Sequence, residues 1–510
     1  MIGVRSISEK KRLNWCALPS GVMLNQLILA DHQSVRASGD DLSNYFYLIR
    51  HLDAWLPRNC FGHAIRGKKI TWLNLEPNRL YSLSFKVVCM GDTNGVDIAQ
   101  ATHEGVLRAA NCLRPEQTLV YGKLFPPSDT LEGLYIDDHL VFQVADKNKH
   151  RPREPYPDEH LLAASRDRYS ELGLPKSEEK AFEKQYTFKA WGTEVCSATG
   201  RVGCPLKKLR QIEELTSQLV LHRYATKKAL QKLIGLFVHP FMHRRECMSI
   251  FHHTYMHTES LPDGCSRKIP QYVQDELITA ALLLPMACSN VRLPVSVKVS
   301  ATDASLGGGG RASTLTSKTF ATALYRYGET KGEYTRLDWS CSPLPPESSM
   351  QKAPVPIVDS PMKHHWTTTQ SCKFRQKQHI NLLELEMLRA EMKARVNAGG
   401  GRCRCINLCD SRVVVGAFAK GRSSSKSLSH GLRSCLPWLI AGDLQLVNLW
   451  VATDKNPADF PSRFKDIPPL SLLVMTLCWI QQYYRGCKLK GPRQSRISWS
   501  KRLGLGKLIP

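Results

Sequence analysis

The segment LEGLYIDDHLVFQV limits the folds open to the first half of the chain. Two short apolar runs, residues 134–136 and 140–142, flank the pair Asp137-Asp138. This pattern predicts a β-hairpin with both carboxylates at its tip. Asp is frequent in ordinary turns, so the pair alone does not establish a site. Two adjacent carboxylates beside a third, however, would hold two Mg²⁺ ions about 3.5–4 Å apart for in-line phosphoryl transfer.

A third carboxylate stands near the start of the chain, ahead of an aromatic run. In SGDDLSNYFYLIR, Asp41 is followed five residues later by Phe46. With these residues the sequence resembles the reverse-transcriptase family, because Tyr135-Ile136-Asp137-Asp138 is similar to its YxDD hairpin and the segment from Asp41 is similar to its first palm motif. The resemblance implies that Asp41 binds metal and that Phe46 excludes a nucleotide 2′-OH. Asp40 is the rival ligand, but only Asp41 has the aromatic residue at the family's distance.

Three further segments follow in the order found in that family. MGDTNGVDIAQ resembles the segment under the template and incoming nucleotide, although the family usually has Gln in place of Met90. The segment around Lys180 resembles the lysine motif that supports pyrophosphate departure, and FKAWG resembles the primer-grip hairpin. Each also fits a structural role: a turn at Gly91, a solvated face at Lys180 and a core position at Trp191. The resemblance assigns substrate binding to Phe46, Met90, Gly91, Gln100, Tyr135, Lys180, Trp191 and Gly192.

Four more acids stand at the ends of predicted elements in the second half. The alternation of Val295, Val297 and Val299 predicts a half-buried strand, and this strand ends at Asp303 before a glycine-rich turn. The turn lacks the Lys-Ser/Thr of a phosphate-binding loop and therefore indicates a hairpin. The remaining acids are Glu384 in a predicted helix that ends near Gly399, Asp410 at the end of the strand INLCD, and Asp459 in NPADFPSR.

These four acids resemble the D-E-D-D set of RNase H, in contexts typical of retroelements. The resemblance implies two Mg²⁺ or Mn²⁺ ions around a scissile RNA phosphate, one to ready the water and one to stabilise the leaving 3′-oxygen. Glu386 competes with Glu384 for the helix position. The family's histidine ahead of the last Asp is missing, and Asp454 is the nearest polar substitute. Residues 420–425 either meet substrate phosphates or form an exposed loop.

Charge and composition indicate the class of partner. Lys and Arg total 70 against 45 Asp and Glu, a net charge of +25, which favours a polyanion such as nucleic acid over a small molecule. A solvated basic surface without chemistry is the alternative. Neither a signal peptide nor an apolar run of the ~18–20 residues that a membrane span needs is visible. Seventeen scattered cysteines indicate an intracellular protein, cytoplasmic or nuclear, and Cys403, Cys405 and Cys409 lack a histidine at metal-site spacing.

We therefore expect a multidomain α+β and α/β protein. The predicted parts are partial fingers and palm (1–195), a helical thumb or connection (196–290), an RNase H-like mixed-sheet domain (291–470) with an insertion or long loop (313–378), and a basic tail (471–510). Thr226 is expected to cap a thumb helix that buries Leu230, Leu233, Ile234 and Phe237. The fingers region is short, so the candidates for gripping the triphosphate are Lys10, Lys11, Arg12 and Arg36.

The function that the resemblance implies is RNA-directed DNA polymerase with RNase H activity, from the polyprotein of an LTR-type or DIRS-like retrotransposon. Its partners would be an RNA template, a DNA primer, deoxynucleoside triphosphates and the RNA–DNA hybrid. No interaction with a membrane is expected. Two alternatives remain open. One is a catalytically decayed copy of such an element, and the other is a polymerase-like protein that binds nucleic acid without catalysis.

Overall fold

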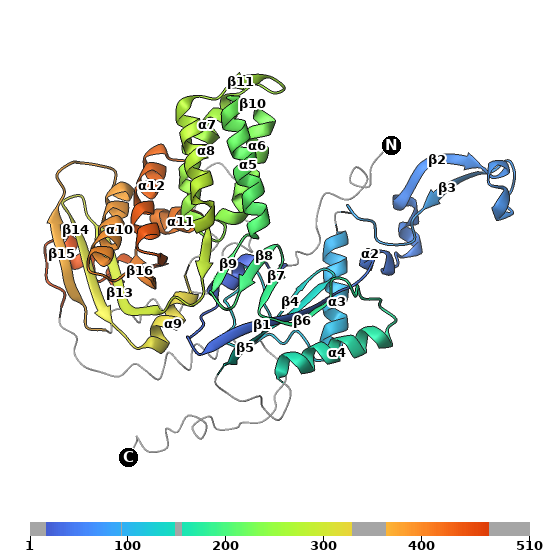
Figure 1. Ribbon diagram of the computed structural model, residues 1–510, viewed down its shortest axis with the longest axis horizontal. Coiled ribbons are helices and arrows are strands. Elements are labelled where there is room, and N and C mark those ends of the chain that lie inside the picture. Colours follow the sequence, from blue (N-terminus) through green and yellow to red (C-terminus); the bar gives the residue numbers. More distant parts are fainter. Residues whose placement is uncertain (1–16, 93, 148–155, 329–363, 469–510) are drawn as a thin grey trace, which may run out of the picture.

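A computed structural model describes residues 17–92, 94–147, 156–328 and 364–468 (Figure 1). The chain combines helices with sheets of mixed strand order. Figure 1 shows a sheet with two helices in the N-terminal part, a helical bundle in the middle of the sequence, and a second large sheet formed by the C-terminal part. Among the described residues, no helix has the length and apolar character needed to cross a bilayer.

The N-terminal sheet positions the first set of acids. It has the strand order β4-β5-β1-β6. Its strands are β1 (Gln33–Asp41), β4 (Thr130–Tyr135), β5 (Asp138–Asp146) and β6 (Phe182–Gln185). Helices α3 (Gly95–Ala109) and α4 (Pro157–Glu171) share one apolar cluster with this sheet. Alternate strand residues, such as Val35 and Ala37, face a second cluster on the opposite side, as the two-residue period of a strand requires.

A smaller sheet and a projecting hairpin complete this part. The smaller sheet has the order β12-β9-β8-β7, made of β7 (Thr187–Ala190), β8 (Thr193–Cys196), β9 (Arg201–Gly203) and β12 (Cys288–Asn290). The 3₁₀ helix η1 (Gly21–Gln26) packs with it in the same apolar cluster. The hairpin of β2 (Cys60–Arg66) and β3 (Leu80–Ser84) extends away from the rest of the chain (Figure 1).

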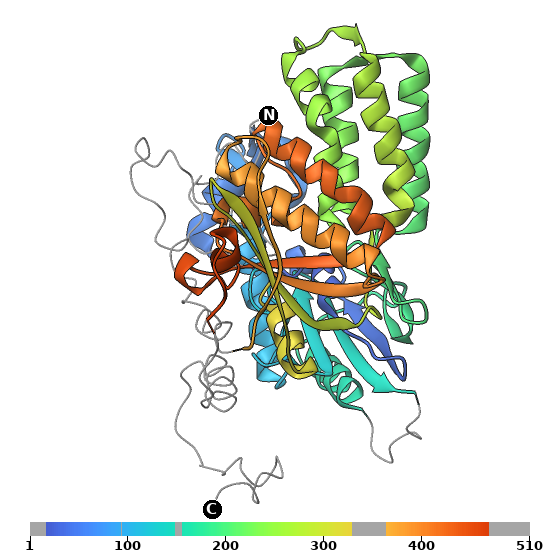
Figure 2. The same cartoon turned by 90° about the vertical axis from the view of Figure 1, so that its left-hand side faces the viewer.

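The middle of the chain is helical, as the sequence predicts. It contains α5 (Leu206–His222), α6 (Lys227–Phe241), η5 (Arg245–Phe251), α7 (His252–Ser260) and α8 (Gln271–Leu283). Thr226 caps α6 by accepting a hydrogen bond from the Ala229 amide at 3.2 Å. The four apolar residues expected on one face of α6 are all buried, and three of them, Leu230, Leu233 and Phe237, share a core with Phe241 and Phe251. Figure 2 shows the bundle standing beside the C-terminal sheet.

The C-terminal sheet has the order β15-β14-β13-β16-β17. Its strands are β13 (Val295–Ala304), β14 (Gly308–Leu315), β15 (Thr367–Lys373), β16 (Cys403–Cys409) and β17 (Leu444–Trp450). Strands β13, β16 and β17 are parallel, and β13–β14–β15 are antiparallel. One face packs against α9 (Lys318–Arg326), and the other against α10 (Ile380–Asn397), α11 (Arg412–Lys420) and α12 (Lys426–Ala441).

One sequence expectation for this sheet was wrong. Val297 is 42% exposed, although Val295 and Val299 are buried. The register of β13 against β16 shifts between those two valines, so the alternation breaks there. The stretch 313–378 was expected to be an insertion or long loop, and its described part contains the end of β14, all of α9 and all of β15. Thr-rich TTTQSCK suits a strand, and Ser317 caps α9 by accepting from the Phe320 amide.

The expected triphosphate-gripping residues fall into two groups. Lys10, Lys11 and Arg12, like the basic tail 471–510, lie outside the described residues. Arg36 is buried, and its guanidinium bonds Asp158 at 2.8 Å and Glu159 at 2.8 Å. The expectation for Arg36 is therefore corrected, because an arginine tied to two acids of α4 is not available to a triphosphate.

Candidate active sites

The first site lies where β1 ends beside the β4–β5 hairpin. Asp41 and Asp138 are directly opposite each other in the antiparallel pairing of β1 with β5. Asp137 occupies the hairpin turn, and its carbonyl accepts a hydrogen bond from the Leu42 amide at 3.1 Å. Ile136, the other turn residue, has a positive φ of 59°. The predicted hairpin is thus present, and the fold brings the three predicted carboxylates to one edge of the sheet.

These carboxylates are crowded. Burial, together with the Asp41 carboxylate as hydrogen-bond partner and neighbouring charge, raises the pKa of Asp138 to about 7. Burial and the charge of Asp41 also raise the pKa of Asp137. The exposed Lys180 balances part of this charge, because its Nζ lies 2.9 and 3.0 Å from the two Asp41 oxygens. Like charges held this close favour binding of a proton or a cation.

Asp40, the alternative candidate for a metal ligand, forms an ion pair outside this group of acids. It points to the α4 side of β1, where Arg166 of α4 holds it through Nε at 2.8 Å and Nη2 at 2.9 Å. The carboxylate is 3% exposed. The alternation of side chains along a strand separates these neighbours, so the geometry favours Asp41 over Asp40 as a member of the site.

Gln100, which was predicted to contact substrate, holds the hairpin tip. Its Nε2 donates to the Leu134 carbonyl at 3.0 Å, and its Oε1 accepts from the Ile136 amide at 2.8 Å. His103, one turn later on α3, lies 2.8 Å from the Ile136 carbonyl and 2.9 Å from the Tyr169 hydroxyl. Burial lowers the pKa of His103 to about 4, so the ring is neutral. Sequence reasoning missed His103, although its spacing of three from Gln100 places both on one helix face.

Trp191 and Gly192 form the two-residue turn between β7 and β8, with φ values of 47° and 79°. Positive φ at both positions is what a tight hairpin turn requires. The Trp191 ring packs against Gly133 of β4, where an added Cβ would lie 2.2 Å from the ring, and meets Phe142 edge-on at 5.7 Å. The indole therefore packs the small sheet against the carboxylate hairpin, and its expected contact with substrate stays a prediction.

Two of the remaining predicted substrate residues, Phe46 and Tyr135, lie in elements next to the three carboxylates. Phe46, in α2 (Tyr45–Leu48), is half-buried, whereas its neighbour Tyr45 is buried and donates its hydroxyl to the Ala99 carbonyl at 3.0 Å. Tyr135 is 37% exposed at the end of β4, and Met90 is 66% exposed. Gly91 has a φ of 100°, in a turn before α3. None of the described contacts joins Met90 or Gly91 to the three carboxylates.

The second site lies at the C-terminal ends of β13 and β16. Asp303 is on β13, Glu384 is in the second turn of α10, Asp410 follows β16, and Asp459 begins α13 (Asp459–Ser462). Ala301 pairs with Leu408 in the parallel ladder, so Asp303 and Asp410 stand side by side two residues later.

Two glycines of β14 let the helices reach this point. A Cβ on Gly309 would lie 2.2 Å from the Met387 Sδ of α10, and one on Gly310 would lie 2.4 Å from the Ala458 carbonyl and the Ser462 amide. Side chains at these positions would push away α10, which carries Glu384, and α13, which carries Asp459. The glycine-rich run that the sequence showed only as a hairpin thus also allows the site to assemble.

The four acids affect one another. Burial and the charges of Asp303, Asp410 and Asp459 raise the pKa of Glu384 to about 9. Burial, with Asp410 and Asp459 nearby, raises the pKa of Asp303 to about 7, although Ser462 opposes the shift. Ligand atoms of Glu384, Cys409 and Asp410 lie within 4.8 Å of one another. Glu386 is two residues further along α10 and therefore faces away from this cluster, so the geometry favours Glu384 over Glu386 as its member.

The donors of this site suit a hard divalent cation. Oε2 of Glu384 and Oδ1 of Asp410 are buried and have no hydrogen-bond partner among the described residues. Carboxylate oxygens are the ligands that Mg²⁺ and Mn²⁺ prefer. Asp459 is half-buried and bonds Arg463 at 2.8 Å, much as Asp41 bonds Lys180. Sequence reasoning missed Arg463. Asp454 is exposed in η11 (Thr453–Lys455), so it does not replace the missing histidine inside the cluster.

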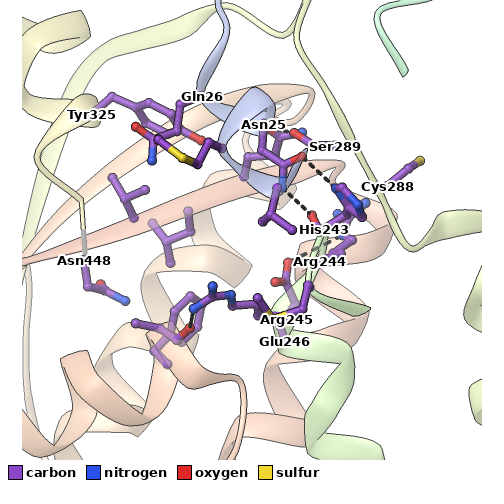
Figure 3. A pocket seen from close by; sticks show the side chains of 18 of the residues that line it. Asn25, Gln26, His243, Arg244, Arg245, Glu246, Cys288, Ser289, Tyr325 and Asn448 are labelled. Atoms are coloured by element: carbon purple, nitrogen blue, oxygen red, sulfur yellow. Dashed lines mark hydrogen bonds and ion pairs between the residues drawn. The ribbon is translucent and has the colours of Figure 1, made fainter. Parts of the chain in front are cut away.

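A cavity of about 170 Å³ lies where η1, η5, β12, α11 and β17 meet (Figure 3). His243 lies between the Asn25 side chain, at 3.0 Å, and the Thr193 hydroxyl, at 3.2 Å. Burial lowers the pKa of His243 to about 3, so it is neutral. Glu246 lines the cavity, and it lies 3.5 Å from Arg244. Glu246 is the only carboxylate among the residues that line this cavity, and it is paired with Arg244. The cavity therefore does not form a third cluster of acids.

The sequence was compared with family models and curated proteins, and none matches. Solved structures do match. A foamy viral protease-reverse transcriptase with double-stranded DNA is 13% identical over 88% of this chain and 62% of its own, with a TM-score of 0.40. The same kind of protein with an RNA/DNA hybrid is 14% identical over 85% and 66%, with a TM-score of 0.37. This chain therefore spans about 62% of the length of the first of these proteins.

Proposed function

We propose that this chain is an RNA-directed DNA polymerase and RNA–DNA hybrid ribonuclease of an LTR-type or DIRS-like retrotransposon. The observation that supports this best is the presence of two separate groups of carboxylates, each assembled from distant segments. In both groups, burial and mutual repulsion raise the pKa of members well above their ordinary values. Such groups destabilise a fold unless they bind something positive, which makes them functional candidates.

The proposed cofactors are two Mg²⁺ or Mn²⁺ ions at each site. When bound, they would supply charge stabilisation at the reacting phosphate. The residues that would hold them are Asp41, Asp137 and Asp138 in the first site, and Asp303, Glu384, Asp410 and Asp459 in the second. All donors are carboxylate oxygens, and two of them are buried without a partner in the described part of the chain.

In the polymerase site, the other residues position the substrates. The exposed ammonium group of Lys180 bonds the Asp41 carboxylate. Once bound cations neutralise this carboxylate, Lys180 would be able to move to the phosphates of a deoxynucleoside triphosphate. Phe46 would sit against the sugar and exclude a 2′-OH. Gln100 and His103 keep Asp137 in place by fixing the turn. The RNA template and DNA primer would lie across this edge of the sheet. Trp191 would support the β4–β5 hairpin by packing against Gly133.

In the nuclease site, the acids would surround one phosphate of the RNA strand. The cluster contains no group suited to reading base edges, so selectivity would come from the 2′-OH and the geometry of the hybrid. Arg463, which bonds Asp459, would have to release that acid. Because the sequence has no histidine between His430 and Asp459, we expect slow product release. With these substrates, the proposed compartment is the cytoplasm, the nucleus or both.

The test uses purified full-length protein with Mg²⁺ or with EDTA. We expect extension of a DNA primer on an RNA template, and cutting of the RNA strand of a hybrid, only with the divalent ion. Hybrid binding without either reaction would favour the non-catalytic binding protein. Absence of both binding and chemistry in a folded sample would favour the decayed copy. All seven acids being retained favours the active enzyme over both.

A further inference from the structure

Two cysteines lie side by side at the start of β16. Cys403 and Cys405 are separated by one residue, so the two-residue period of a strand places both side chains on the same face. Their Sγ atoms lie 3.4 Å apart. Asp410 follows the other end of β16, so the two thiols are not part of the nuclease acids.

The two thiols differ in exposure and in their surroundings. Cys403 is half-buried, whereas Cys405 is 1% exposed. The Cys403 Sγ also lies 3.3 Å from the Gly400 carbonyl. The hydrogen bond from Cys405 and the charge of Arg395 lower the pKa of Cys403 to about 7, against the effects of burial and of Asp443. Because a thiolate is the reactive form of cysteine, Cys403 is the nucleophile of the pair.

The backbone at this point has room to bring the two sulfur atoms together. Cys403 and Cys405 pair in register with β17 on one side. On the other side, the pairing of β16 with β13 changes register between Val295 and Val299, and such an irregularity increases the local twist of a strand. Cα atoms two residues apart in a strand lie about 6.6 Å from each other, or less where the strand is strongly twisted. A disulfide spans Cα separations of roughly 4.4–6.8 Å, so the pair is within reach of one.

We propose that Cys403 and Cys405 form a site of thiol–disulfide exchange whose substrates are small disulfides such as oxidised glutathione. The Cys403 thiolate attacks one sulfur of the disulfide and releases one thiolate, which leaves a mixed disulfide on Cys403. Cys405 then loses its proton, attacks the Cys403 Sγ and releases the second thiolate. The two cysteines lose two electrons and two protons, the two released thiolates take up the protons, and a disulfide joins Cys403 to Cys405.

This exchange does not depend on the proposed polymerase or nuclease. A disulfide at the upper end of the usual Cα range is readily reduced, so the reaction runs in both directions. In a reducing compartment such as the cytosol, disulfides of this kind are transient. The ratio of small disulfide to small thiol around the protein would therefore set the oxidised fraction of the pair.

The experiment uses the full-length protein, which is reduced, freed of reductant and exposed to oxidised glutathione without denaturant. The oxidant is raised until the exposed Cys60 and Cys265 carry glutathione, and the remaining thiols are blocked before digestion with trypsin. Trypsin cuts after Arg402, Arg404 and Arg412. The two cysteines of the pair therefore fall on separate peptides, which stay joined only through a disulfide.

Two serine variants separate the roles of the thiols. Cys405→Ser should retain glutathione on Cys403, because the second thiol is missing. Cys403→Ser should leave Cys405 almost unmodified, because this thiol is buried. We expect at least about tenfold more glutathione on Cys403 in the first variant than on Cys405 in the second. In denaturant, both variants should take up glutathione equally, since the difference comes from the fold.

We expect joined peptides from the folded parent, and we expect dithiothreitol to separate them. Absence of the joined peptides from the folded parent would overturn the proposal, as would a mixed disulfide that persists on Cys403 in that protein. Equal uptake of glutathione by the two serine variants without denaturant would also overturn it, because the fold would then not distinguish the two thiols.

Discussion

Glu384→Gln should stabilise the metal-free protein at alkaline pH while abolishing hybrid cleavage. Glu384 is 4% exposed, and burial, together with the charges of Asp303, Asp410 and Asp459, raises its pKa from 4.5 to about 9. A carboxyl whose pKa is raised in the folded state supports stability below its unfolded value, and that support is lost as the pH rises toward 9. Gln has the same shape without the charge, so this loss should disappear in the variant.

The magnitude follows from the shift. At pH 8 a glutamate in the unfolded chain is ionised. In the folded protein, Glu384 either stays protonated or is ionised beside the other three carboxylates, and both states lower the free energy of unfolding. One pKa unit corresponds to about 1.4 kcal/mol, which sets an upper limit of about 5 kcal/mol at pH 8. Neighbouring acids can take up protons in its place, so we expect a gain of roughly 2–4 kcal/mol at pH 8 and almost none near pH 4.5.

The assay is hydrogen exchange of the β13 and β16 amides, because unfolding of a multidomain chain need not be a single step. The matched control is Glu386→Gln on the opposite face of α10, which should have no such pH-dependent effect. Mg²⁺ should protect the parent at pH 8 by binding to the folded state, and should protect the variant less. Equal protection of parent and Glu384→Gln protein across this pH range would refute the crowded-acid account.

Three further results are expected. Asp137→Asn should abolish deoxynucleotide incorporation in primer extension but keep hybrid affinity, which comes mainly from basic contacts; normal extension would contradict the palm assignment. Phe46→Ala or Phe46→Val should raise ribonucleotide relative to deoxynucleotide incorporation, because Tyr45 is turned away toward Ala99; an unchanged ratio in an active enzyme would place the gate elsewhere. Gly133→Ala should lower stability by about 1–3 kcal/mol in chemical denaturation, through its clash with the Trp191 ring. Trp191→Leu should relieve that loss in the double variant, and additive effects would contradict the packing account.

The acids could be placed from the sequence because each stands at a strand or helix end with a local pattern around it. The hairpin at Asp137-Asp138, the cap at Thr226 and the apolar face of α6 rest on neighbours within a few residues. Local rules of this kind need no knowledge of the tertiary fold. These local rules therefore predicted the strands and helices that carry both groups of acids.

The partners of these acids could not be placed in this way. Arg166 and Asp40 are separated by 126 residues, and Lys180 and Asp41 by 139. Pairing over such distances depends on which strands and helices pack together. The same holds for Trp191, whose ring lies against Gly133, and for Arg36, which sequence reasoning left free and the fold buries. The break at Val297 arises from a register shift that no local alternation can show.

The most direct test of the account is a crossed pair of substitutions in the full-length protein, each assayed for primer extension and hybrid cleavage in Mg²⁺. The two acid groups are built from different segments and share no described contact, so the activities should separate. Asp410→Asn should abolish cleavage and keep extension, and Asp138→Asn should do the reverse. Cleavage by the Asp410→Asn protein at the parental rate, or loss of both activities in either folded variant, would contradict two independent carboxylate sites.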